Sequence, residues 1–338
     1  KAWIADGRIA IVGGRNIGDA YFDVSGTSNF RDMDLLMLGP AVQQTETIFD
    51  SFWNSASAIP IEALSRNRRG DLARLHKKLE ALTTAGPAAP YLRQLIEERD
   101  AAAMLGGGRR LHWTTDTTVV SDPPEKALGS GEQRWLITAI RPVLFGASSE
   151  VEIVSPYFIP GADGLRRITE LLARGVRVSV LTNSLAATDV AAVHGAYASY
   201  RQALLEAGVK LFELKANITE RKISLFGSSG ASLHTKAFTV DRTFGFVGSF
   251  NFDPRSISLN TEMGVLFRDP EVADEIRKVV AEETAPGRSY LLALSDGKLV
   301  WQDRCPPLAR TWNHEPKASI WRRIVATLIG LLPIESQL

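Results

Sequence analysis

The sequence predicts an α/β protein built from two pseudo-repeated halves, each a mixed β-sheet flanked by helices. Two observations lead to this prediction. Residues 1–16, KAWIADGRIAIVGGRN, align without a gap on residues 236–251, KAFTVDRTFGFVGSFN, and an internal repeat indicates two related units. Between residues 151 and 214, apolar strand-like runs alternate with helical patterns, which is typical of a layered domain with largely parallel central strands.

The composition narrows the function classes. A chain of 338 residues with 45% hydrophobic content buries one large core or two coupled ones. The net charge is +1, from 39 basic and 38 acidic residues, so no global field attracts nucleic acid. The single Cys305 excludes an internal disulfide and a cysteine metal cluster, and leaves the localisation open. No apolar run reaches the length needed to span a bilayer, about eighteen residues.

The first half, predicted to cover residues 1–120, begins with a buried strand over residues 9–12 that ends at a Gly-Gly turn. A second strand is expected over 33–39 and a third over 111–120. Helices are expected between 41 and 105, with His76 in solvent. Two apolar stripes there are interpreted as core-facing: Val42, Ile48, Phe49 and Phe52 in one, and Leu72, Leu75, Leu79 and Leu82 in the other.

Residues 121–131 are rich in Pro and Gly and are predicted to form a linker, so that the second half covers residues 132–338. Residues 217–232 are predicted to form a mobile flap. A C-terminal helix over 320–332 is amphipathic, and closing the core is slightly favoured over lying in a membrane interface. The expected strands and helices of the second half are strand 151–154, helix 161–174, strand 176–181, helix 188–207, strand 209–214, strands 237–240 and 244–250, and strand 263–267.

The stretch 233–251, LHTKAFTVDRTFGFVGSFN, carries the candidate chemistry. His234 and Lys236 are two residues apart and therefore leave an extended strand on the same face. Asp241 marks a turn, and the returning strand brings Ser249 and Asn251 back towards them. A histidine can attack or protonate a phosphodiester, while a lysine and an amide hold the phosphate oxygens.

The pattern H-x-K-(x)4-D-(x)6-G-[SG]-x-N, present once complete and once without its histidine, resembles the phospholipase D superfamily. The segments GGRNIGDAYF, FRDMDLLMLGP, SPYFIPG and LPIESQL are similar to its bacterial cardiolipin synthase branch. In the first motif the histidine would stand two residues before Lys1. We therefore expect the chain to be truncated at its N-terminus, starting inside that motif.

The resemblance implies that the two motifs share one active site at the interface of the halves. It also implies a phosphatidyltransferase that makes cardiolipin from phosphatidylglycerol and a second phospholipid through a phosphohistidine. The first-motif histidine would be the nucleophile, and His234 would be the acid and base. The fragment alone would then be inactive or nearly so. The partners implied are phospholipids and a membrane surface, with no cofactor, no metal and no nucleic acid, at the bacterial inner membrane as a peripheral or anchored protein.

Roles for the other motif residues follow from the same resemblance. Lys236 and Lys1 would neutralise phosphate oxygens. Asn251, Asn16 and Ser249 would donate hydrogen bonds, whereas Gly14, at the position of Ser249, has no hydroxyl to donate. Asp241 and Asp6 would tie down the motif loops. Asp32 and Glu262 precede corresponding strands and would support the histidines, although solvated strand-end acids are an equal alternative from sequence alone.

Other functions stay open. A phospholipase D-type hydrolase would use the same residues with water as the acceptor. A nuclease of the superfamily would be expected to carry a basic groove, which the balanced charge does not favour. A lipid-binding relic without activity is the third alternative, if Lys1 is the true start. Outside the motifs, His194 is expected to be a packed helical residue, and core packing or substrate contact are equal alternatives for Tyr157 and Phe158.

Overall fold

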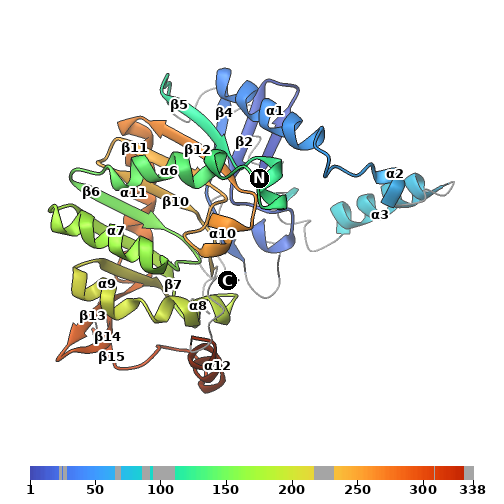
Figure 1. Ribbon diagram of the computed structural model, residues 1–338. Coiled ribbons are helices and arrows are strands. Elements are labelled where there is room, and N and C mark those ends of the chain that lie inside the picture. The colour runs from blue at the N-terminus through green and yellow to red at the C-terminus, as the bar shows by residue number, and fades with distance from the viewer. Residues whose placement is uncertain are drawn as a thin grey trace.

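The computed structural model of the chain describes residues 1–22, 25, 29–64, 70–85, 92–93, 111–216, 232–307 and 309–330. It confirms the α/β class. Within these residues the strands form a ten-stranded sheet, a three-stranded sheet and a separate pair (Figure 1). The strands are β1 (Ala2–Ala5), β2 (Ile9–Gly13), β3 (Phe30–Arg31), β4 (Asp34–Leu38), β5 (Thr117–Ser121), β6 (Glu150–Val154), β7 (Arg177–Asn183), β8 (Lys210–Leu214), β9 (Ser232–Leu233), β10 (Ala237–Val240), β11 (Phe244–Gly248), β12 (Met263–Arg268), β13 (Ser289–Ser295), β14 (Lys298–Asp303) and β15 (Arg310–Trp312).

The helices cover the sheets. The described helices are α1 (Pro40–Trp53), α2 (Ile61–Leu64), α3 (Asp71–Ala85), α6 (Leu136–Phe145), α7 (Gly161–Ala173), α8 (Ala191–Ala198), α9 (Arg201–Ala207), α10 (Pro254–Ser258), α11 (Pro270–Glu283) and α12 (Ile320–Gly330), with short 3₁₀ helices η1 (Asp19–Tyr21), η2 (Pro124–Leu128) and η3 (Glu132–Arg134). Two of them begin with a side-chain cap, because Asp253 and Asp269 accept hydrogen bonds from the first free backbone NH groups of α10 and α11.

The large sheet has the strand order β15-β14-β13-β8-β7-β6-β10-β11-β12-β5. Its centre, β6-β7-β8, is parallel, and the strands on either side are antiparallel. Apolar side chains of α6, α7, α8 and α9 pack on one face, and those of α11 pack on the other. A sheet covered on both faces buries nearly every residue of its central strands, which explains why these strands appear in the sequence as continuous apolar runs.

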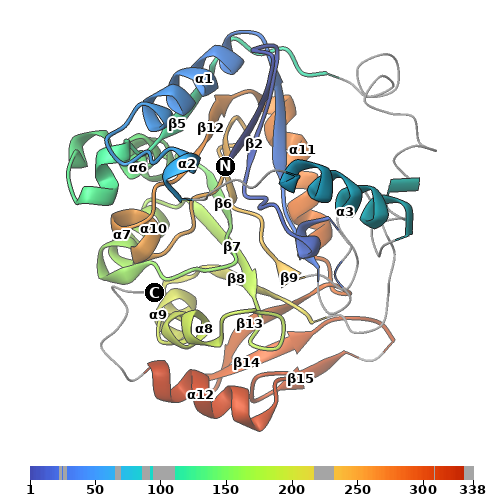
Figure 2. The ribbon, with the colours of Figure 1, turned by 90° about the vertical axis from the view of Figure 1, so that its right-hand side faces the viewer.

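The small sheet, β1-β2-β4, is antiparallel throughout. Val12 of β2 and Val42 of α1 form a core with Val119 of β5 and Val265 of β12. The small sheet and α1 therefore pack against the β12-β5 edge of the large sheet (Figure 2). The division of the chain into two halves stays a prediction. Strand β5, which the predicted boundary assigns to the first half, hydrogen-bonds to β12 of the second half.

Several predicted boundaries are wrong. The predicted helix 188–207 is two helices, α8 and α9, which are separated at Ser199 and Tyr200. The predicted strand 111–120 is limited to β5, and the strand 244–250 ends at Gly248. The predicted flap, apart from Ser232 at the start of β9, lies outside the described residues, as does much of the predicted helical region 41–105.

The predicted linker is more structured than its composition indicated. Asp122 and Lys126 are buried and form an ion pair of 2.8 Å. The Asp122 carboxylate also accepts the backbone NH of Leu136 and of Glu262. A fully paired and hydrogen-bonded charge inside the protein fixes geometry. Residues 121–131 are thus fastened to Leu136 and Glu262 of the predicted second half, and the Pro and Gly residues serve the turns of η2 and η3.

Two predictions of core-facing helices are wrong. The four leucines of α3 are all about half exposed or more, and no described residue of α3 is buried. The large apolar side chains of α12 are also exposed, so this helix does not close the core. Periodicity identified both helices as amphipathic, but it does not say what the apolar face meets. Among the described residues, no helix is long and apolar enough to cross a bilayer.

Candidate active site

The two motifs form two hairpins with the same register. In β1-β2, Ala2 pairs with Val12 and Ala5 pairs with Ile9. In β10-β11, Ala237 pairs with Val247 and Val240 with Phe244, which are the same pairs shifted by 235 residues. The next strand continues the match, because Asp34 is opposite Gly13 and Gly264 is opposite Gly248. This register places Asp32 and Glu262 at corresponding positions.

Both hairpins turn through left-handed backbone at the motif aspartate. The φ angles are 52° at Asp6 and 62° at Gly7, against 51° at Asp241 and 58° at Arg242. Asp241 accepts the backbone NH groups of residues 148, 149 and 150 at 2.8, 2.7 and 3.0 Å. It lies at the end of β10 opposite to Lys236, about 16 Å away at 3.3 Å per residue. Asp241 therefore fastens the hairpin to β6 and lies outside the reach of a phosphate held at Lys236.

The two halves meet at the short parallel pair β3-β9. Arg31 pairs with Leu233, and the NH of His234 donates to the carbonyl of Arg31 at 2.7 Å. The Asn183 side chain also holds Leu233, accepting its NH at 3.0 Å and donating to its carbonyl at 2.9 Å. The next residue on each strand follows the same register. Asp32 of the first half consequently lies beside His234 of the second.

His234 is oriented by that carboxylate. Its Nδ1 lies 2.6 Å from Oδ2 of Asp32, and its Nε2 lies 3.4 Å from the hydroxyl of Tyr21. The Tyr21 and Phe30 rings pack around the imidazole with centroids 5.0 Å from its own. Burial lowers the pKa of His234, and the hydrogen bond to Asp32 only partly opposes this. Near pH 7 the imidazole is neutral, with Nδ1–H on Asp32 and Nε2 free to act as a base or nucleophile.

Lys236 is buried, with 2% of its surface exposed. Its Nζ donates to the carbonyl of His234 at 2.5 Å. Burial lowers its pKa to about 7, although the charge of Asp32 opposes the shift. The Lys1 charge acts on both His234 and Lys236, and the Nζ of Lys1 donates to the carbonyl of Gly14 at 3.0 Å. The lysines of the two motifs therefore contribute to one electrostatic site.

The remaining motif residues occupy different places. The Asn16 amide donates to the Tyr21 hydroxyl at 2.7 Å and so reaches His234 through that ring. The Ser249 hydroxyl, by contrast, is buried and donates to the Glu262 carboxylate. Asn251 is buried, and its side-chain oxygen has no hydrogen-bond partner within the described part of the chain. A buried acceptor without a donor is costly, so the Asn251 oxygen is available to a donor group of a ligand.

The difference between Gly14 and Ser249 has a steric cause. A Cβ at Gly14 would lie 2.6 Å from Oδ1 of Asp32. A serine at position 14 would thus displace the carboxylate that holds His234. The second motif accommodates Ser249 because Glu262 has one more methylene group than Asp32 and accepts the hydroxyl as a hydrogen bond.

Comparison with known proteins gives the family. Residues 140–283 match the family described as "Cardiolipin synthase, PLD-like domain". The chain is 34% identical to Cardiolipin synthase C of Escherichia coli over 99% of its own length and 72% of that protein. The chain belongs to the phospholipase D-like cardiolipin synthase family.

More distant relatives agree. The chain is 26% identical to a cardiolipin synthase of Geobacillus kaustophilus, over 83% of this chain and 44% of that one. Phosphatidylserine synthase of Haemophilus influenzae, at 14% identity, superimposes with a TM-score of 0.57 over 97% of this chain and 67% of that one. That likeness concerns the fold. In each case the known protein is longer than the chain described here.

Some residues of the candidate site were not predicted from the sequence. Tyr21 and Phe30 surround His234, although only the segments that contain them were noted. The Tyr157 hydroxyl donates to both carboxylate oxygens of Asp189 at 3.0 and 2.8 Å, while Phe158 is buried in the core. Burial raises the pKa of Asp253 to about 6. A tyrosine or aspartate in a loop has no periodic pattern, so its place depends on tertiary structure.

A possible metal site and a pocket lie apart from His234. Within the described residues, His194, Glu213 and Glu315 are close enough together to hold an ion. The guanidinium of Arg201 already occupies their centre, 2.8 Å from Glu213 and 2.6 Å from Glu315, so this packed network does not fit a cation.

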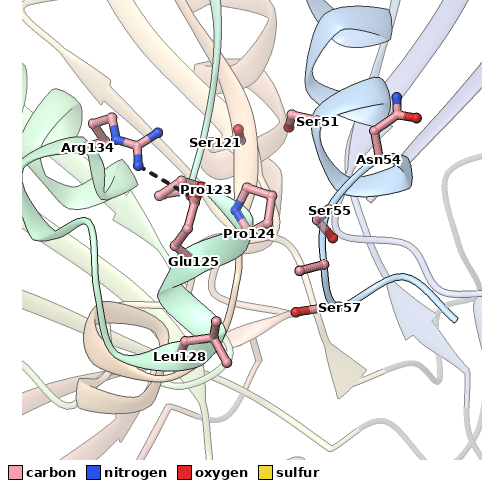
Figure 3. Close-up of a pocket in the computed structure, with 11 residues that line it drawn as sticks. Ser51, Asn54, Ser55, Ser57, Ser121, Pro123, Pro124, Glu125, Leu128 and Arg134 are labelled. Carbon is pink, nitrogen blue, oxygen red and sulfur yellow. Dashed lines mark hydrogen bonds and ion pairs between the residues drawn. The ribbon is translucent and has the colours of Figure 1, made fainter.

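A pocket of about 550 Å³ lies where η2 meets the end of α1 (Figure 3). None of the candidate site residues lines it.

Proposed function

We propose that the chain carries the greater part of the active site of a phosphatidyltransferase that makes cardiolipin from phosphatidylglycerol and a second phospholipid. The observation that supports this most is the 2.6 Å contact between Asp32 of the first half and His234 of the second. A carboxylate that orients an imidazole, beside a buried lysine, is suited to acid and base chemistry on a phosphodiester. The membership in the cardiolipin synthase family supports phospholipids as the substrates.

The proposed reaction has two steps. A histidine two residues before Lys1, corresponding to His234 in the repeat, attacks phosphorus of the donor and forms a P–N bond. The P–O bond to glycerol breaks, and the protonated form of His234, a minority near pH 7 because burial lowers its pKa, gives its proton to the leaving oxygen. Neutral His234 then takes the proton of the acceptor hydroxyl, whose oxygen attacks the phosphohistidine and releases the first histidine. Over the two steps the proton count is unchanged, because the proton that His234 gives to the leaving oxygen is recovered from the acceptor hydroxyl.

The other residues act on charge and orientation in this proposal. Lys236 and Lys1 neutralise the non-bridging oxygens, and the NH₂ group of Asn251 donates a hydrogen bond to them. Ser249 acts through Glu262, the carboxylate that corresponds to Asp32 and would orient the first-motif histidine. Asp241 and Asp6 act on the hairpin turns. We place the protein at the inner membrane of a bacterium, bound peripherally or through an anchor, because its substrates are there.

The test is conversion of phosphatidylglycerol to cardiolipin in mixed micelles, followed by mass spectrometry. The protein is the chain extended by a strand that ends in His-Xaa before Lys1. We expect turnover, and we expect His234→Ala to remove it. His76→Ala is the matched control, because His76 is exposed on α3 and should leave the rate unchanged. Phosphatidic acid as the main product would instead support a hydrolase, and full turnover by His234→Ala would exclude the proposed mechanism.

A further inference from the structure

The helix α12 exposes its large side chains and buries its small ones. Trp321 is 76% exposed, Ile320 68% and Leu328 59%, and Ile324 and Val325 are also exposed. Residues 320, 324 and 328 form one stripe at 100° per residue, and residues 321 and 325 lie beside it. A helix that belongs to a protein core turns such side chains inward. The opposite orientation indicates that this stripe meets something outside the described protein.

The attachment of α12 to the body explains this orientation. It packs on α8 through small residues, since a Cβ on Gly195 would lie 2.3 Å from the Ala326 carbonyl oxygen. Ala326 is buried together with Leu185 and Ala318. So close an approach of two backbones leaves no room for a large side chain between them. In both views the helix lies at the edge of the molecule beside α8 (Figure 1, Figure 2).

The charge of α12 indicates what covers the stripe. The helix carries Arg322 and Arg323 and no acidic residue, and the exposed Lys317 precedes it. Both arginines lie on the side that faces the body, where they donate to the backbone carbonyls of Thr188 and Ala318, whereas Lys317 is exposed to solvent. An aliphatic and tryptophan face with a basic residue at its end and no acidic residue is typical of helices that lie in the interface of an anionic bilayer. At eleven residues the helix is about 16 Å long, which is too short to span a bilayer.

A second copy of the chain fits this surface less well. The exposed face of α12 is roughly 16 Å long and 10 Å wide. Its area is therefore far below the ~800 Å² that each partner buries in a stable interface. Neither copy would offer an acidic residue on α12 to pair with the exposed Lys317 of the other. Lipid phosphates supply that opposite charge.

The same helix also contacts the loop that reaches the active site. The Arg322 guanidinium donates to the carbonyl of Thr188. The next residue, Asp189, accepts the Tyr157 hydroxyl, and its charge acts on Tyr21 and Lys236. We propose that α12 lies flat in the interface of an anionic bilayer and thereby holds the Thr188–Asp189 loop and the site around His234 at the lipid headgroups. This inference rests on the proposed phospholipid substrate.

The first experiment measures binding without catalysis. The chain is sedimented with phosphatidylcholine vesicles that contain or lack phosphatidylglycerol, and Trp321→Ser/Leu328→Ser is compared with the matched exposed pair Trp113→Ser/Val279→Ser. We expect the α12 variant to lose at least tenfold in partitioning, because two large apolar side chains would no longer enter the bilayer. The control should bind as the parent does. All these positions are exposed, so circular dichroism should show unchanged folding.

A second measurement addresses the occupant. Brominated lipid should quench fluorescence of the parent chain, and Trp321→Phe should remove that part of the quenching. Equal vesicle binding by the α12 variant and its control would overturn the inference, as would a dimer in solution that Trp321→Ser dissociates. Binding does not depend on His234, so a lipid-bound chain that makes no cardiolipin contradicts only the proposed function. Normal cardiolipin synthesis without α12-dependent binding contradicts only this inference.

Discussion

The hairpins β1-β2 and β10-β11 share register, turn and motif spacing, yet their surroundings differ. β10 is paired on both sides, with β6 and β11, and every residue in it is buried. β1 is paired with β2 alone among the described strands, and it is largely exposed. Lys236 is consequently enclosed. The repeat thus determines the shape of each hairpin, while the neighbouring layers determine how much of its surface is covered.

The cross-strand row on one face shows the same difference. In the first hairpin the row is Trp3, Ile11 and Leu36, and all three are exposed. The corresponding row is Phe238, Phe246 and Leu266, which belongs to the core between the large sheet and its helices. The two rows are equally apolar, so the sequence of the hairpin alone does not determine which one is covered.

The largest expected effect concerns the histidine itself. In the extended chain, both motifs would carry His-x-Lys, and the comparison between the hairpins would become complete at the site. We expect the extension to raise phosphatidyl transfer by on the order of a thousandfold over the chain as printed, because catalytic groups that act together lose most of the rate when one is missing. The measurement is the rate of cardiolipin formation. Equal rates with and without the extension would show that the two hairpins do not form one unit.

The second prediction compares the apolar rows. Phe246→Ala should destabilise the fold by about 3–5 kcal/mol, since it opens a cavity in the core, while Ile11→Ala should cost less than about 1 kcal/mol. Urea unfolding followed by circular dichroism measures both. If the two variants lose similar stability, the row at Ile11 is covered in solution and the difference between the hairpins is smaller than described.

The third prediction uses the pKa of Lys236. With its pKa lowered to about 7 by burial, the free lysine loses its charge as the pH rises, and a bound phosphodiester restores it. Affinity for glycerophosphoglycerol should therefore fall above pH 7, by up to about tenfold per pH unit. His234, with a pKa already below its usual value, is neutral over that range. Calorimetric titration with glycerophosphoglycerol at several pH values measures this affinity.

Two variants provide the control for that titration. Lys236→Arg keeps its charge at all these pH values and should remove the dependence on pH. Lys1→Arg, the same change in the exposed hairpin, should leave it in place. A slope that persists in Lys236→Arg would assign the titration to another group.

The smallest expected effect compares the turn aspartates. Asp241→Ala should cost about 1–2 kcal/mol, because it removes the acceptor of three backbone NH groups, and Asp6→Ala should cost little. Burial opposes ionisation of Asp241, but the NH donors together outweigh it and lower its pKa. Its contribution is therefore complete above the ordinary pKa of about 4 and is lost as the pH falls through the lowered value. Thermal unfolding at pH 7 and at successively lower pH should show a difference from the parent that is full at pH 7 and shrinks as the pH falls below about 4.

The sequence predicted those parts of the site that depend on local pattern. The ungapped repeat anticipated the two hairpins, and the placement of Asp32 and Glu262 before corresponding strands agrees with the register. It did not predict Tyr21 or Asp189, because loop residues reach His234 and Lys236 only through tertiary packing. It also gave α3 and α12 a place in the core, since an apolar stripe appears the same whether it meets protein, lipid or water.

The contact between Asp32 and His234 also bears on how such a double unit is maintained. The imidazole belongs to one half and its carboxylate to the other, 202 positions earlier in the chain. By the repeat, Glu262 stands in the reciprocal position towards the first motif. Under the proposed mechanism neither half would hold a complete pair of imidazole and carboxylate of its own, so a damaging change in either half would remove the shared function. Selection would then act on both halves together even where their sequences diverge.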